Sequence, residues 1–69
     1  MERVADKIRW FNEKKGYGFS ESESCFLHIS NFEEIPEGKI PRTGDRISFF
    51  IVEDEKGRKA KEIMFLSVY

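Results

Sequence analysis

The segment of residues 14–30, KKGYGFSESESCFLHIS, brings aromatic rings and basic side chains close together. It contains Tyr17, Phe19 and Phe26, together with the only histidine of the chain, His28. Flat rings can stack on the faces of nucleobases, and lysine side chains beside them can neutralise phosphates. The chemistry that these residue types favour is therefore the binding of single-stranded nucleic acid.

No pattern in the sequence favours catalysis. One histidine and one cysteine, Cys25, are too few for a zinc site. The sequence also lacks a nucleophile–base pair and a glycine-rich phosphate loop. We expect no enzymatic activity, no metal and no cofactor.

The 69 residues have the length of one small domain and a formal net charge of −1. Basic residues cluster in residues 1–20 and 56–61, whereas residues 21–37 are acidic. If the basic segments meet in the folded chain, one face would be basic, but solvated clusters without a partner are the simpler alternative. The unpaired Cys25 suits a reducing cytoplasm. No apolar run is long enough to span a membrane, so we expect a cytoplasmic protein without a membrane partner.

Short alternating or β-branched runs predict an all-β fold. The expected strands are residues 7–12, 17–22, 24–30, 46–53 and 58–64. The stretch DEKG at residues 54–57 predicts a hairpin loop. The long connection at residues 31–44 could begin with one helical turn, which Pro36 would end. Five strands at this spacing indicate a small barrel or sandwich.

Alternation along the strands assigns side chains to an inner or an outer face. The expected core positions of the third and fourth strands are Cys25, Leu27, Ile29, Ile47, Phe49 and Ile51. In the second strand, the small Gly18 and Ser20 take the inner face, which leaves Tyr17 and Phe19 outside. Rings on the outside opposite such small residues indicate a surface that serves a partner molecule.

The first strand alternates less clearly, because strict alternation places a ring on each of its faces. A bulge within it could bring Trp10 and Phe11 to the same side. Trp10 could equally be a core residue, since small domains often bury their one tryptophan.

The motifs KIRWFNEKKGYGF and CFLHIS resemble the two RNA-binding signatures of the cold-shock domain family. The resemblance implies a five-stranded antiparallel OB-type barrel, with one domain at residues 1–69, a core at about 6–63 and an apolar C-terminal extension at 64–69. It also implies binding of single-stranded RNA or DNA. The activity implied is that of an RNA chaperone or a regulator of transcription or translation.

By resemblance, the expected nucleic-acid contacts fall into two groups. The stacking positions are Trp10, Tyr17, Phe19, Phe26 and His28, with Phe11 at their margin. The polar contact positions are Lys7, Asn12 and Lys15, and Lys56 and Lys59 are expected to border the same surface.

The sequence departs from the family pattern at several positions. Ser20 stands where the family usually buries an aliphatic residue, which should weaken the core by about 1–3 kcal/mol. Phe50 occupies an outer position where a polar residue is common, and the tail MFLSVY is apolar. Phe50 and Phe65 could pack together, extend the fifth strand or form a weak homodimer contact with residues 64–69. The alternative function is therefore a protein-interaction or self-associating module.

Overall fold

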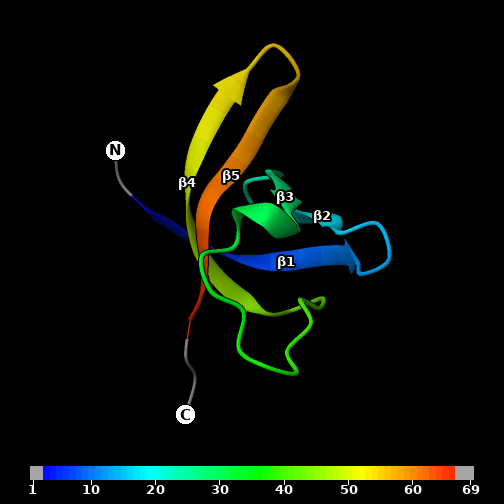
Figure 1. Cartoon of the computed structure of the whole chain (residues 1–69). Helices are drawn as coiled ribbons and strands as arrows, with labels where there is room; N and C mark the ends of the chain where they lie inside the picture. Colours follow the sequence, from blue (N-terminus) through cyan, green and yellow to red (C-terminus); the bar gives the residue numbers. More distant parts are fainter. Residues whose placement is uncertain (1–2, 67–69) are drawn as a thin grey trace.

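The computed structural model describes residues 3–66, whose strands close into a barrel in the order β1-β2-β3-β5-β4 (Figure 1). The strands are β1 (Val4–Asn12), β2 (Tyr17–Ser20), β3 (Phe26–His28), β4 (Arg46–Asp54) and β5 (Gly57–Phe65). A short 3-10 helix, η1 (Ile29–Asn31), follows β3. The predicted all-β, five-stranded barrel is confirmed.

One strand pair differs from the expected antiparallel arrangement. The pairs β1–β2, β1–β4, β2–β3 and β4–β5 are antiparallel, but β3 and β5 pair in parallel through Phe26 and Lys59. The expectation of a wholly antiparallel barrel is therefore wrong at this closing pair. The physical reason is the long connection after η1, which carries the chain across the barrel so that β5 returns beside β3 in the same direction.

The second and third strands are shorter than the sequence predicted, because the chain around them forms other hydrogen bonds. Residues 21–25 form a loop, in which Ser24 has a φ of 54°. After β3, the His28 side chain accepts a hydrogen bond from the Ser30 backbone N–H and caps η1. Ile29, expected as an inward strand residue, therefore lies in η1 and is half-buried.

Apolar side chains from β1, β3, β4 and β5, together with Cys25 and Phe32, fill the barrel. The buried core consists of Ile8, Cys25, Leu27, Phe32, Ile47, Phe49, Ala60 and Ile63. Four of the six predicted core positions in the third and fourth strands are thus confirmed. Ile51 only packs against the edge of this core, where β4 continues into the hairpin that projects beyond the barrel (Figure 1).

The predicted bulge in β1 is present, but its effect differs from the expectation. The β1–β2 register shifts between Ile8 and Trp10, which places Ile8 in the core and leaves Trp10 40% exposed. Phe11 packs against the core, with its ring edge-on to Phe32 at 6.0 Å between centroids. The expectation that Trp10 and Phe11 face the same side is wrong, because they follow the bulge as consecutive residues of an alternating strand.

Gly18 lies on the inner face of β2, where β1 comes closest. A Cβ atom at this position would lie 2.1 Å from the Trp10 carbonyl oxygen and 2.8 Å from the Phe11 Cα. Any side chain would therefore have to move the β1 backbone, so glycine allows the two strands to approach.

The two phenylalanines considered as partners near the C-terminus have different neighbours. Phe65 completes β5 opposite Ile47, and its ring lies 5.3 Å from that of Phe32. The Phe50 ring is covered by the Arg3 guanidinium at 4.8 Å. Packing of Phe50 on Phe65 is therefore wrong, whereas the extension of the fifth strand is correct. With Phe65 packed inward, these contacts give no support to a homodimer through the two rings, and residues 67–69 lie outside the described residues.

Candidate nucleic-acid interface

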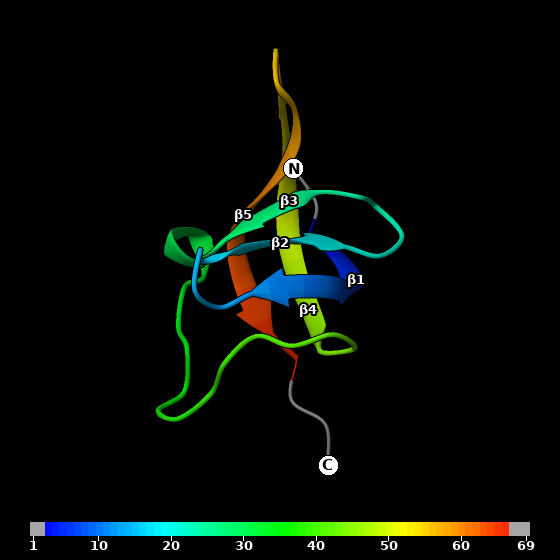
Figure 2. The ribbon, with the colours of Figure 1, turned by 90° about the vertical axis from the view of Figure 1, so that its right-hand side faces the viewer.

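Five rings form a continuous surface on the outside of β1, β2 and β3, which lie side by side in Figure 2. This surface, called the aromatic face below, consists of Trp10, Tyr17, Phe19, Phe26 and His28. Cross-strand pairing places Tyr17 opposite His28, and Phe19 opposite both Phe26 and Trp10. Neighbouring centroids lie between 5.5 and 6.1 Å apart.

Every ring of the aromatic face is partly or well exposed, so the predicted outward orientation is confirmed. The inner face of β2 is occupied by Gly18 and Ser20, both buried. Ring edges and faces are therefore available to flat ligands from outside, while the sheet behind them is held by the packed core.

The orientation of His28 is fixed by its neighbours. Its Nδ1 accepts a hydrogen bond from the Ser30 backbone N–H at 3.1 Å and lies 2.8 Å from the Ser30 hydroxyl. Because Nδ1 is an acceptor here, the proton of the neutral ring is on Nε2. The ring is thereby held beside Phe26, with 6.1 Å between centroids.

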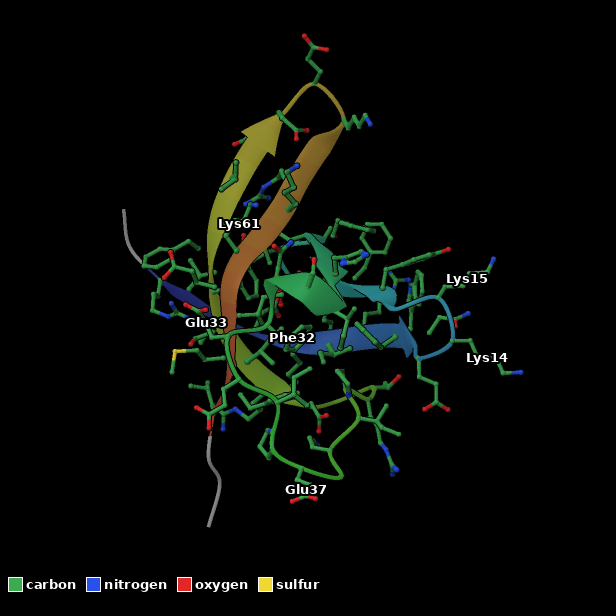
Figure 3. All side chains as sticks on the ribbon, in the orientation of Figure 1. Lys14, Lys15, Phe32, Glu33, Glu37 and Lys61 are labelled. Carbon is green, nitrogen blue, oxygen red and sulfur yellow. The ribbon has the colours of Figure 1, made fainter. Side chains whose placement is uncertain are left out.

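The turn between β1 and β2 carries three of the residues considered from the sequence. The Asn12 side-chain oxygen accepts a hydrogen bond from the Lys15 backbone N–H at 3.0 Å, which stabilises this turn. Lys14 and Lys15 point away from the barrel (Figure 3). Asn12 thus has a structural role in the turn that immediately precedes Tyr17, and the two lysines are exposed beside it.

Lys7 is exposed on β1. It lines a shallow depression that also contains Asp6, Glu21 and Arg46, and no ring of the aromatic face. Phe11 is separated from the aromatic face, because its ring packs towards the core. Of the predicted site residues, Phe11 is therefore the one whose ring is turned towards the core.

The opposite end of the aromatic face borders a groove beneath the β4–β5 hairpin, which rises beyond β3 in Figure 2. The groove has a volume of about 560 Å³ and is lined by Phe19, Ser24, Phe26, Asp54, Lys56, Gly57, Arg58 and Lys59. The predicted border residues Lys56 and Lys59 are therefore brought together with two of the rings. The Lys59 ammonium forms an ion pair with Asp54 at 2.9 Å.

Comparison with known proteins shows to which family this chain belongs. The family model of the 'Cold-shock' DNA-binding domain matches residues 5–66. The chain belongs to the cold-shock domain family. Members of this family bind single-stranded nucleic acids. Within residues 3–66, the structure contains no helix that is long and apolar enough to cross a membrane.

Similar curated proteins are bacterial cold-shock proteins. A cold shock-like protein of Aquifex aeolicus is 36% identical over 64 residues, covering 86% of this chain and 89% of its own. Cold shock protein CspB of Bacillus caldolyticus is 38% identical over 64 residues, covering 87% and 94%.

A solved structure supports the same fold. The structure of Drosophila Unr CSD456 superposes with a TM-score of 0.75 at 20% identity. The match covers 96% of this chain and 27% of that longer one. At this identity, the likeness concerns the fold alone.

The structure of this cold-shock domain contains an anchor that the sequence analysis missed. Asp6 is only 9% exposed. Its carboxylate accepts hydrogen bonds from the backbone N–H groups of Lys7 at 2.7 Å, Ser22 at 3.0 Å and Glu23 at 2.8 Å. Burial raises the pKa of Asp6, but these bonds and one from the Ser20 side chain outweigh it and hold the pKa below its usual value. The sequence offered one indication of this anchor: Asp6 lies two positions before the buried Ile8, and residues two apart in a strand share a face.

Ser20 and Cys25 join the loop anchored by Asp6 to the core. The Ser20 hydroxyl accepts a hydrogen bond from the Cys25 backbone N–H at 2.8 Å, so this buried polar group is satisfied. Burial raises the pKa of the Cys25 thiol, which favours a neutral, structural side chain. Within residues 3–66, no cluster of His, Cys, Asp and Glu residues could hold a metal ion.

The groove residue Arg58 and its partner Glu23, in the β2–β3 loop, are two further residues that the sequence analysis did not select. Arg58 Nη2 lies 3.0 Å from Glu23 Oε1, and its Nη1 donates to the Glu23 carbonyl oxygen at 3.2 Å. The basic cluster at residues 56–61 includes Arg58, but its pairing with Glu23 depends on how the chain folds.

Proposed function

We propose that this cold-shock domain binds single-stranded RNA or DNA by stacking bases on the aromatic face. The observation that supports the proposal is the contiguity of five exposed or half-buried rings across three neighbouring strands. Each stacked base contributes about 1–3 kcal/mol, as judged from alanine substitutions in other proteins. Three or four stacked bases would therefore dominate the affinity.

Cations at the two ends of the aromatic face would contact the phosphates. Lys15 lies at the β1–β2 turn, and Lys56 and Lys59 line the groove at the hairpin. Lys7, Asn12 and Phe11 would have smaller roles, because Lys7 lines a different depression, Asn12 stabilises the turn and Phe11 packs towards the core.

Stacking on π-faces implies loose sequence specificity, since every base offers such a face. Binding of this kind fits a role as an RNA chaperone or as a regulator of transcription or translation. The names of the bacterial cold-shock relatives support the same class of protein. We further infer that the protein acts in the cytoplasm and without catalysing a reaction.

The proposal is tested by titrating the protein with short single-stranded RNA and DNA homopolymers while following Trp10 fluorescence. The Phe19→Ala variant removes the ring that contacts both Trp10 and Phe26. We expect a loss of about 1–3 kcal/mol, or roughly 5- to 150-fold in Kd. Stability should change less, because Phe19 is outside the core cluster.

Phe50→Ala is the matched control, since Phe50 is a ring on a different part of the barrel, beneath Arg3. Its affinity should equal that of the wild type. Absence of binding to every oligonucleotide at low salt, or an equal loss in both variants, would refute base stacking on the aromatic face.

A further inference from the structure

Two of the three cations that line the groove beside the aromatic face are paired with carboxylates. Arg58 is held by Glu23, and Lys59 is held by Asp54. Lys56 forms no ion pair among residues 3–66. The positive charge available to a ligand in the free protein is therefore smaller than the sequence indicates.

We propose that Glu23 masks Arg58 in the free protein, and that a nucleic-acid phosphate entering the groove displaces the Glu23 carboxylate. This inference rests on the proposed function, and it adds to it a residue that limits affinity. Glu23 thus acts as an internal competitor of the phosphate.

The location of the pair makes this competition direct. Arg58 lines the same groove as Phe19 and Phe26. A nucleotide stacked on either ring therefore brings its phosphate to the groove that contains the guanidinium. Arg58 donates to Glu23 twice, but only the Nη2 bond goes to the carboxylate, and the Nη1 bond goes to the uncharged carbonyl oxygen. A phosphate can accept two parallel charge-assisted hydrogen bonds from a guanidinium group.

The pair is weak enough to be displaced. Its side chains are 40% exposed at Arg58 and 34% exposed at Glu23. Ion pairs at such positions contribute about 0–1 kcal/mol, because water and salt screen them. A phosphate can therefore replace the carboxylate at little cost.

The loop does not depend on this pair for its position. Asp6 holds the Ser22 and Glu23 backbone N–H groups from the other side. When the Glu23 carboxylate leaves Arg58, these bonds remain, so the mask can open without unfolding the loop.

Glu23 is also the better of the two carboxylates for a test. Asp54 accepts a hydrogen bond from the Lys56 backbone N–H at 2.9 Å in addition to its ion pair with Lys59. Its replacement would disturb the hairpin turn as well as the charge. Replacement of the Glu23 side chain leaves its backbone bond to Asp6 in place.

The experiment compares Glu23→Gln with Glu21→Gln, which removes an exposed carboxylate from the same loop that forms no ion pair within residues 3–66. Both are titrated with an oligothymidylate about six nucleotides long, at several salt concentrations. We expect Glu23→Gln to bind about two- to fivefold more tightly than the wild type. The slope of log K against log salt should steepen by about 0.7, as for one more phosphate contact with a single strand. Glu21→Gln should leave the slope unchanged.

The double variant Glu23→Gln/Arg58→Gln identifies the group that gains the phosphate. It should lose both the added affinity and the added slope. Equal behaviour of the two single variants, or a gain that persists without Arg58, would overturn the mask while leaving the proposed function intact. If the wild type does not bind the oligonucleotide at all, the proposed function fails, and the mask fails with it. Urea unfolding of each variant checks that the fold is kept.

Discussion

Replacement of Asp6 by asparagine tests whether a buried carboxylate holds the β2–β3 loop in place. Oδ1 accepts from the Lys7 backbone N–H at 2.7 Å, and Oδ2 accepts from the Glu23 N–H at 2.8 Å. The Ser22 N–H lies within 3.1 Å of both oxygens. Asparagine carries an NH2 group in place of one oxygen, so in either orientation it presents a donor to a backbone donor.

The size of the effect follows from these contacts. A hydrogen bond to a charged group contributes about 1.5–3 kcal/mol, and one to a neutral group contributes about 0.5–1.5 kcal/mol. Asp6→Asn loses one charged bond and weakens the others, which should lower the free energy of unfolding by about 2–4 kcal/mol. A domain of this size has a total of only about 3–10 kcal/mol, so the loss would be a large fraction.

The contribution of Asp6 also depends on pH. Its pKa in the folded state is lower than in the unfolded chain, where it is about 3.9. The carboxylate therefore stabilises the fold fully at pH values above the unfolded pKa, and this contribution is lost as the pH falls through the lower folded pKa. The difference in stability between wild type and Asp6→Asn should thus be largest near neutral pH and shrink in acid.

Urea unfolding at a series of pH values, followed by Trp10 fluorescence, measures both quantities. The control is Glu21→Gln, which neutralises an exposed carboxylate of the same loop and should shift the free energy of unfolding by less than about 0.5 kcal/mol. Asp6→Asn within that same margin at neutral pH, or a difference from the wild type that does not change with pH, would refute the anchor.

Two further pairs of substitutions test the packing of the barrel. Gly18→Ala should cost about 3 kcal/mol in urea unfolding, because its Cβ would lie 2.1 Å from the Trp10 carbonyl oxygen. Gly38→Ala, with a φ of +79° but open space around the Cβ, should cost only about 1–2 kcal/mol, and equal losses would contradict the close approach. Phe65→Ala should cost about 2–4 kcal/mol through its lost contact with Phe32, clearly more than Phe50→Ala. A larger loss in Phe50→Ala would show that the inward packing of Phe65 matters little.

The amino-acid sequence was sufficient for the features that depend on the period of a strand. Alternation placed Cys25 and Leu27 inside and Phe26 and His28 outside, as the structure does. It also placed the rings of β2 outside, because small residues at Gly18 and Ser20 leave nothing large to bury. The strand period depends only on local backbone geometry, so a single sequence carries it.

The sequence was less informative about the polar part of the candidate site. It indicated that cations would border the rings; the structure places Lys56 and Lys59 in the groove beside Phe19 and Phe26, and Lys7 in a different depression. Because side chains of Lys and Arg are compatible with many exposed positions, their number in a segment does not say which face they reach.

Tertiary structure alone decided the contacts between distant segments. The pairing of Glu23 with Arg58 joins residues 35 positions apart, and Asp6 reaches the Glu23 N–H across 17 positions. Both contacts join segments that are distant in sequence and that lie together in the closed barrel. Strand order and register set which distant groups meet, and these follow from the packing of the whole core, which no short stretch of sequence specifies.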